Sequence, residues 1–67
     1  MRRVAAHCVI TPSQSYQQAV VVLSGGAVVE IFTFTEELPA TEWLGGTIYV
    51  EPDENGILRA YQDGVQL

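Results

Sequence analysis

The chain has 67 residues, enough for one small domain over residues 1–67, whose single core supplies about 3–5 kcal/mol of net stability at most. Hydrophobic residues make up 48% and charged residues 16%, a composition typical of a folded chain whose surface keeps apolar patches. Three arginines and eight carboxylates give a formal net charge of −5, which argues against nucleic acid or an anionic membrane as a partner.

The start of the chain does not resemble a secretory leader. Arg2 and Arg3 supply positive charge, but His7 and Pro12 interrupt the run that follows. A single cysteine, Cys8, is typical of a protein in a reducing compartment. We therefore expect a cytoplasmic protein.

The first predicted element is a strand over residues 3–11, because apolar and more polar residues alternate along it. The apolar positions, which we expect to face the core, are Val4, Ala6, Cys8 and Ile10. Adjacent strand residues point to opposite faces, so His7 and Cys8 do not share a site. A reactive cysteine needs a base and a cleft, and a structural zinc needs about four ligands. We predict that Cys8 is a buried small hydrophobe, that His7 is a surface or packing residue, and that the pair has no catalytic or metal role.

The next two elements form a hairpin. Runs rich in valine, over residues 17–23 and 27–35, flank a Ser-Gly-Gly turn, where glycine supplies the positive φ that tight turns need. Glu30 has the same parity as Phe32 and Phe34. We therefore expect this face to be partly buried, with Glu30 near an edge.

The segment over residues 36–46 interrupts the strand pattern. Pro39 and a pair of glycines leave room for no more than a short helical turn over residues 40–44. This connection is the only one long enough to cross to another sheet.

The remaining elements are short strands joined by turns. Strands are predicted over residues 47–51 and 57–62, and "PDENG" at residues 52–56 is a strong turn signal between them. Asp-Gly is a hairpin dipeptide, after which residues 65–67 form a short returning strand or a frayed tail. The predicted fold class is all-β, a small antiparallel β-sandwich or partly open barrel of five or six strands.

An acidic and aromatic cluster is the main candidate for a site. Glu36, Glu37 and Glu42 lie near Trp43 in the sequence, and paired carboxylates can act as acid and base or bind a cation. The favoured interpretation is a solvated loop in which Trp43 plugs the core, because tryptophan buries a large area. The functional alternative is a contact surface centred on Trp43, since tryptophan is enriched at interface hot spots.

Other motifs are explained by turn chemistry. The stretch from Asp53 to Gly56 lacks the ligand spacing of a calcium loop, and the glycine pair before the third strand lacks the lysine of a phosphate loop. The chain has one histidine, and no serine and aspartate can be combined with it sensibly to form a catalytic triad. No cofactor is therefore predicted.

Three stretches carry a resemblance to a known family. "MRRVAAHCVITP", "VVVLSGGAVVEIF" and "TEWLGGTIYV", within residues 1–50, resemble the first segment of some bacterial amidohydrolases. In that family the segment builds a small β-sandwich, the composite domain, beside a metal-binding barrel. The chain continues "EPDENGILRAYQDG" where the family has its His-x-His motif, so no metal ligand or catalytic residue is implied here. The chain also resembles a group of small uncharacterised bacterial proteins with a "TEWLGG"-like centre. The resemblance implies the sandwich without an enzyme.

The leading functional hypothesis is a non-catalytic β module that acts through protein association, most simply as a homodimer, because open strand edges and apolar patches pair readily. The residues expected at the contact or ligand surface are Trp43, Glu42, Phe32, Phe34 and Tyr49. One alternative is a small-ligand-binding domain with a pocket near Trp43. Another is an accessory subunit of a hydrolase, or an enzyme in its own right.

Overall fold

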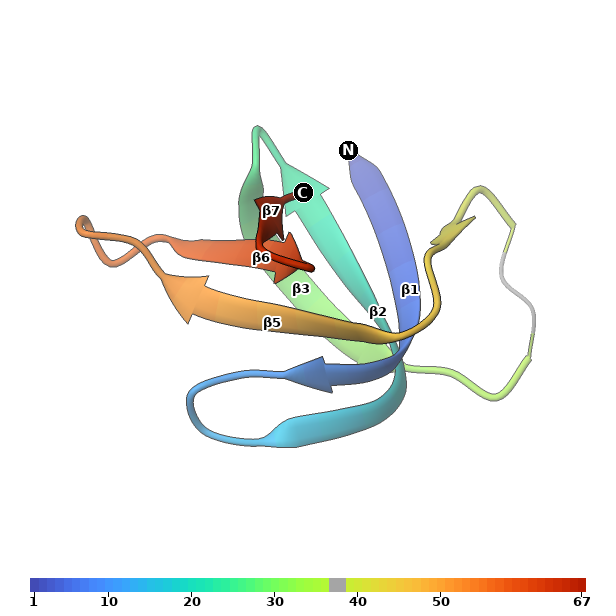
Figure 1. Cartoon of the computed structure of the whole chain (residues 1–67). Coiled ribbons are helices and arrows are strands. Elements are labelled where there is room, and N and C mark those ends of the chain that lie inside the picture. The colour runs from blue at the N-terminus through green and yellow to red at the C-terminus, as the bar shows by residue number, and fades with distance from the viewer. Residues whose placement is uncertain (37–38) are drawn as a thin grey trace.

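The computed structural model describes residues 1–36 and 39–67, in which all regular secondary structure is β-strand (Figure 1). The strands are β1 (Arg2–Ile10), β2 (Ser15–Ser24), β3 (Ala27–Thr33), β4 (Glu42–Trp43), β5 (Thr47–Pro52), β6 (Leu58–Gln62) and β7 (Val65–Gln66). This confirms the predicted all-β class, with two very short strands beyond the main ones. Among the described residues, no helix could cross a membrane.

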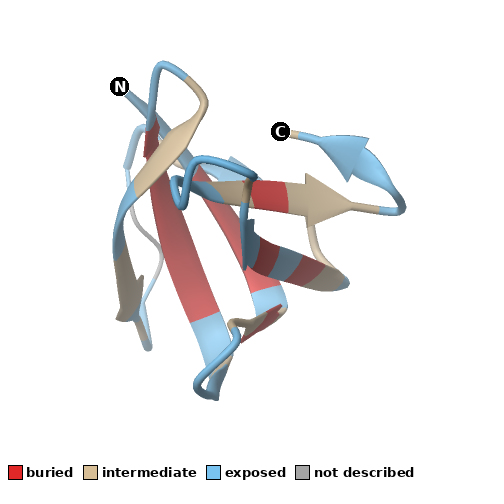
Figure 2. Cartoon of the chain, turned by 90° about the vertical axis from the view of Figure 1, so that its left-hand side faces the viewer, coloured by how far each residue is buried: buried red, intermediate tan, exposed pale blue. Residues whose placement is uncertain are grey.

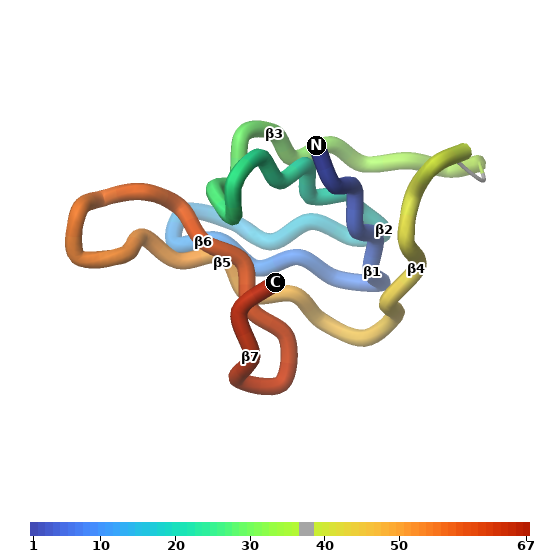
Figure 3. The backbone as a smooth tube through the Cα atoms, turned by 90° about the horizontal axis from the view of Figure 1, so that it is seen from above, coloured from blue at the N-terminus to red at the C-terminus, as the bar shows by residue number. Residues whose placement is uncertain are grey.

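All seven strands belong to one sheet, in the order β3-β2-β1-β5-β6-β7, with β4 beside β1. The sheet curls but does not close, so it corresponds to the partly open alternative and not to two separate sheets. Seen from above, the β5–β6 turn and the β3–β4 connection lie at opposite ends of the molecule (Figure 3). The predicted hairpin is confirmed as the antiparallel pair β2–β3, and its edge strand β3 carries Glu30, which is exposed.

The connection after β3 does not lead to another sheet, because all the strands belong to one sheet; instead, the chain returns to this sheet on the other side of β1. There β4 pairs in parallel with the first half of β1, and β5 pairs in parallel with the second half. The predicted helical turn over residues 40–44 is wrong. Glu42 and Trp43 extend along β1 instead, and the Leu44 N–H donates to the Ala5 carbonyl at 2.9 Å. The open edge of β1 satisfies backbone groups that a single helical turn would leave unpaired.

β1 and β2 bend together in mid-strand (Figure 1). Regular pairs flank the bend, Ala6 with Ala19 on one side and Cys8 with Gln17 on the other, and Gln18 between them has a left-handed φ of 53°. At this point the side chains that reach the main core change from even to odd numbers along β1, from Ala6 to Val9. The prediction of a buried Cys8 is therefore wrong, because Cys8 is only half-buried while Val9 is fully buried.

The buried residues lie on β1, β2, β5 and β6 (red in Figure 2). They form two clusters, which strand alternation places on opposite faces of the long strands. The main core is enclosed by the curl of the sheet and consists of Val4, Ala6, Val9, Ala19, Val21, Leu23, Ile48, Val50 and Ala60. The smaller cluster lies on the opposite face of β1–β3, which we call the outer face, and consists of Ala5, Val20 and Val22 with Phe32 and Phe34 packed against it. Over its β1–β3 part the sheet therefore has buried apolar residues on both faces, and the outer face also carries the exposed Arg3 and Glu30 on either side of Val22.

The predicted turn after β5 is confirmed, and Asp53 organises it. Its carboxylate accepts hydrogen bonds from the N–H groups of Asn55 at 2.8 Å and Ile57 at 3.0 Å. It also forms an ion pair with Arg59 at 3.1 Å, and Arg59 reaches across to the Gly25 carbonyl at 3.4 Å. The N–H of Ile57, followed by Arg59 and Asn55, lowers the pKa of Asp53. Arg59 thus links β6 to the β2–β3 turn across the open side of the sheet.

Candidate functional site

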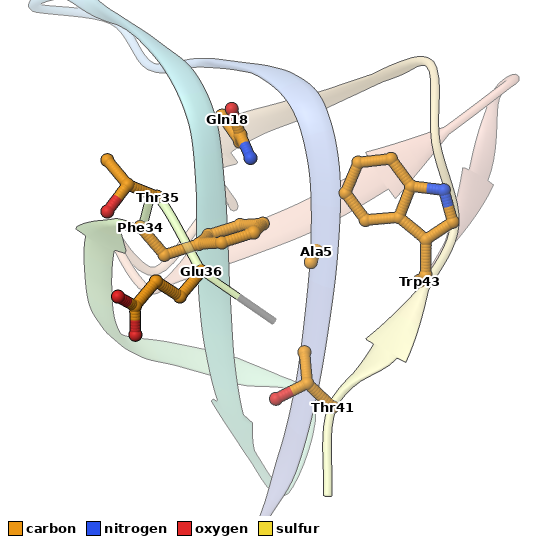
Figure 4. Close-up of a pocket in the computed structure, with 7 residues that line it drawn as sticks. All are labelled: Ala5, Gln18, Phe34, Thr35, Glu36, Thr41 and Trp43. Carbon is orange, nitrogen blue, oxygen red and sulfur yellow. The ribbon is translucent and has the colours of Figure 1, made fainter. Parts of the chain in front are cut away.

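A groove of about 490 Å³ lies on the outer face, between the end of β3 and β4. Phe34 and Trp43 stand on opposite sides of it, and the small side chain of Ala5 forms part of the floor between them (Figure 4). A larger residue at this position would occupy space that the groove leaves open. The groove therefore depends on a small residue flanked by two large ones.

Strand pairing places these residues. Ala5 on β1 lies opposite Val20 on β2 and beside Trp43 on β4, while Val20 lies opposite Phe32 on β3. Residues directly opposite one another in neighbouring strands share a face of the sheet. The N–H of Phe34 donates to the Gln18 carbonyl at 3.1 Å, which continues the pairing past the end of β3. The groove thus lies beside a row of outer-face positions across four strands, and Ala5 and Trp43 of that row line it together with Phe34.

Trp43 is held by two aromatic neighbours and stays accessible. Its ring centroid lies 4.8 Å from that of His7 and 6.4 Å from that of Phe34, each at 89° between ring planes. Edge-to-face pairs of this kind contribute about 0.5–1.5 kcal/mol beyond area burial. Trp43 is nevertheless 53% exposed and lies outside both clusters. The interpretation that Trp43 plugs the core is therefore wrong, whereas His7 is the surface packing residue that the sequence predicted.

The rest of the described lining is polar. It consists of the side chains of Gln18, Thr35, Thr41 and Glu36. Among these lining residues, Glu36 is the only one with a charge. Gln18 holds its left-handed φ at a cost of about 1–2 kcal/mol relative to an ordinary backbone conformation. The groove thus offers aromatic walls, hydroxyl and amide groups, and one carboxylate, a combination suited to an apolar or cationic group.

Three of the five predicted site residues lie together, and Tyr49 and Glu42 lie elsewhere. Trp43, Phe34 and Phe32 come together on the outer face, the first two as walls of the groove and Phe32 packed on the cluster beside it. Tyr49 lies elsewhere, on β5, where it is 48% exposed and lines a separate hollow with Ile10 and Pro12. The candidate surface is therefore smaller than the sequence predicted.

The predicted acidic cluster is divided. Glu42 does not line the groove, because it forms a two-pronged ion pair with Arg2, at 2.6 Å from Nε to Oε2 and 3.1 Å from Nη2 to Oε1. The hydrogen bond from Arg2 lowers the pKa of Glu42. Glu37 lies outside the described residues, so of the glutamates only Glu36 is found at the groove.

Sequence reasoning did not identify Ala5 or Gln18 as groove residues. Ala5 lines the groove because β1 pairs with β4, which joins residues about forty positions apart and leaves no local signal. Gln18 lines it because the chain after β3 continues beside β2, where the Phe34 N–H donates to the Gln18 carbonyl. Thr35 and Thr41 belong to the long connection, where side-chain direction is not set by strand alternation. In the described parts of the chain, no three His, Cys, Asp or Glu side chains are grouped so as to hold a metal ion.

Comparison with protein-family models, with curated proteins and with solved structures finds no match to this chain. The resemblance to the amidohydrolase segment therefore stays a prediction.

Proposed function

We propose that this protein is a non-catalytic binding module that acts through protein association, most simply as a homodimer formed by the outer face. One observation carries the proposal: the aromatic end of this face has no second layer over it among the described residues, and Trp43 is 53% exposed. An antiparallel sheet with one solvated face ordinarily presents polar residues there. Here the groove end of that face presents, beside its polar residues, the half-buried rings of Phe32 and Phe34 and the exposed ring of Trp43.

The composition of this surface supports an interface. Tryptophan is enriched among hot-spot residues, which lie near the centre of an interface inside a ring of weaker contacts. Trp43 has that setting, with apolar Phe32 and Phe34 to one side and polar Thr41 nearby. A standard interface buries about 800 Å² per partner, roughly a fifth of the chain's 4240 Å². One face of a domain this small is sufficient for an interface of that size.

Light scattering coupled to size exclusion, over a wide range of concentrations, tests the proposal. The wild-type chain is expected to form a dimer that Trp43→Ala weakens. Tyr49→Ala is the matched control, because Tyr49 is similarly exposed at 48% but lies in the other hollow. A monomer at all concentrations, or equal effects of the two substitutions, would contradict association through the outer face. Circular dichroism of both variants checks that they remain folded.

A second candidate function, small-ligand binding, is favoured by the groove itself. Its volume of about 490 Å³ falls within the range of roughly 300–1,000 Å³ found for small-molecule sites. Trp43 forms one wall, so its fluorescence reports on occupancy. A monomeric chain whose fluorescence changes saturably with one compound of a metabolite panel would favour this function, and a flat response across the panel would count against it.

A further inference from the structure

We propose that in the homodimer Arg3 of each copy inserts into the groove of the other copy, between Trp43 and Phe34 and within reach of Glu36. This inference rests on the proposed function and adds the contact that fixes the orientation of the two copies. The argument depends on where Arg3 lies, on the symmetry that its position allows, and on the match between its guanidinium and the groove.

Arg3 projects from the outer face. It lies opposite Val22 of the outer cluster and two residues before Ala5, so its side chain is on the same face as the groove floor. Arg3 is exposed. The chain's other two arginines form ion pairs, with Glu42 and Asp53, but Arg3 has no ion-pair partner within residues 1–36 and 39–67.

Glu36 is the matching acidic group at the groove. It lines the groove and is exposed. Within the part of the chain that the structure describes, its carboxylate likewise makes no ion pair. The outer face also carries Glu30, which lies on β3 opposite Val22, in the same row as Arg3, but does not line the groove. Arg3 and Glu36 form no ion pair with each other or with another side chain in the described parts of the chain.

A two-fold axis brings these groups together twice. In a two-fold interface the same patch is used by both copies, so a contact from residue i to residue j is always repeated from j to i. A two-fold axis that lies in the interface, perpendicular to β1 and above the point midway between Arg3 and Ala5, would set Arg3 of each copy over the Ala5 floor of the other. Because both residues lie on β1, one rotation satisfies both contacts at once.

The groove suits a guanidinium chemically. Arginine stacks on aromatic rings and pairs with carboxylates, and tryptophan is the best aromatic partner for a cation. Here Trp43 and Phe34 supply the rings, and Glu36 supplies a carboxylate at the rim of the groove, on the side of Phe34 away from Trp43 (Figure 4). Each copy also carries a net charge of −5, so two copies repel one another overall. A cation placed in each groove opposes that repulsion at the contact itself.

The test is a charge exchange followed by analytical ultracentrifugation. Arg3→Glu and Glu36→Arg each place like charges in the groove, and each is expected to weaken the dimer at least about tenfold. The double variant Arg3→Glu/Glu36→Arg restores opposite charges and is expected to recover most of the affinity. Glu54→Arg, in the exposed β5–β6 turn, makes the same change in net charge as Glu36→Arg and is expected to leave the dimer intact. Circular dichroism confirms that every variant is folded.

The possible failures are distinguishable. If the wild-type dimer forms and Trp43→Ala weakens it, but both single charge variants associate like wild type, the Arg3 contact is overturned and the proposed function stands. If neither single loss is recovered in the double variant, the pairing of Arg3 with Glu36 is overturned in the same way. If the wild-type chain is a monomer throughout, both proposals fail. If that monomer binds arginine amide with a change in Trp43 fluorescence, the groove takes a free cation and not a second copy.

Discussion

Adjacent valines in β2 provide a direct test of whether the outer face is packed within a single chain. Val20 belongs to the outer cluster and Val21 to the main core, yet both are 0% exposed. Truncation of either to alanine removes the equivalent of two methylene groups, about 0.8 kcal/mol each, before any cost of the cavity left behind. We expect each substitution to lower the free energy of unfolding by about 2 kcal/mol.

Such a loss is large for this chain, since a single core of this size supplies about 3–5 kcal/mol in all. For a domain of 60–100 residues, 1 kcal/mol corresponds to about 4–8 °C in Tm, so each variant should melt roughly 8–16 °C lower. Thermal unfolding followed by circular dichroism measures the shift. Two protein concentrations are needed, because association would add its own stabilisation.

Val29→Ala is the control for this experiment, because Val29 is 56% exposed and its truncation should change stability by no more than about 0.5 kcal/mol. If Val20→Ala behaved like Val29→Ala while Val21→Ala cost the expected amount, the outer cluster would not be packed in the single chain. The floor of the groove would then lack the rigidity that both proposals require.

Three further predictions concern backbone strain and electrostatics. Gln18→Val should lower the free energy of unfolding in urea by more than about 1 kcal/mol, because a β-branched residue resists the left-handed φ of 53°. Gln18→Gly should be tolerated, because glycine adopts this φ readily. Equal urea midpoints for the two variants would contradict this prediction. The pKa of Asp53 is lowered, chiefly by the hydrogen bond from the N–H of Ile57. The ionised carboxylate therefore stabilises the folded state above the ordinary pKa of 3.8, and this contribution is lost as the pH falls through the lowered pKa. Urea midpoints should therefore decline in that acid range for the wild type and less steeply for Asp53→Asn, and parallel declines would refute the assignment. Glu42→Gln should destabilise the fold only slightly, and the difference should shrink at high salt, because its ion pair with Arg2 is exposed. A loss independent of salt would be inconsistent with this interpretation.

The local parts of the fold were accessible from sequence. The β2–β3 hairpin follows from two valine-rich runs around a glycine turn, and Gly25 and Gly26 do take positive φ, at 59° and 81°. The turn organised by Asp53 follows from the ability of aspartate to accept hydrogen bonds from backbone groups that follow it. In both cases the residues that determine the structure are close together in the chain.

The switch of core-facing side chains from even to odd positions along β1 could not be predicted from the sequence. The alternation that includes Ala6 and Cys8 continues without a break in the sequence, so a regular strand is the simplest interpretation. The change coincides with Gln18, on the partner strand, which adopts a conformation that glutamine rarely takes. Nothing in the neighbouring sequence indicates it. The position of Trp43 was inaccessible for a similar reason, because β4 exists only where it meets the edge of β1.

The bend and the groove are linked through β1. After the bend, Val9 turns inward to the main core, while before it Ala5 and His7 remain on the outer face beside Trp43. A straight β1 would continue the even-numbered core side chains to Cys8 and leave Val9 on the outer face. The bend therefore completes the main core, and it ends the apolar stretch of the outer face at His7 and Gln18. The groove therefore ends at polar residues on this side. An apolar surface of a partner can cover only the part of the outer face between Arg3 and Gln18, and the proposed two-fold contact lies there.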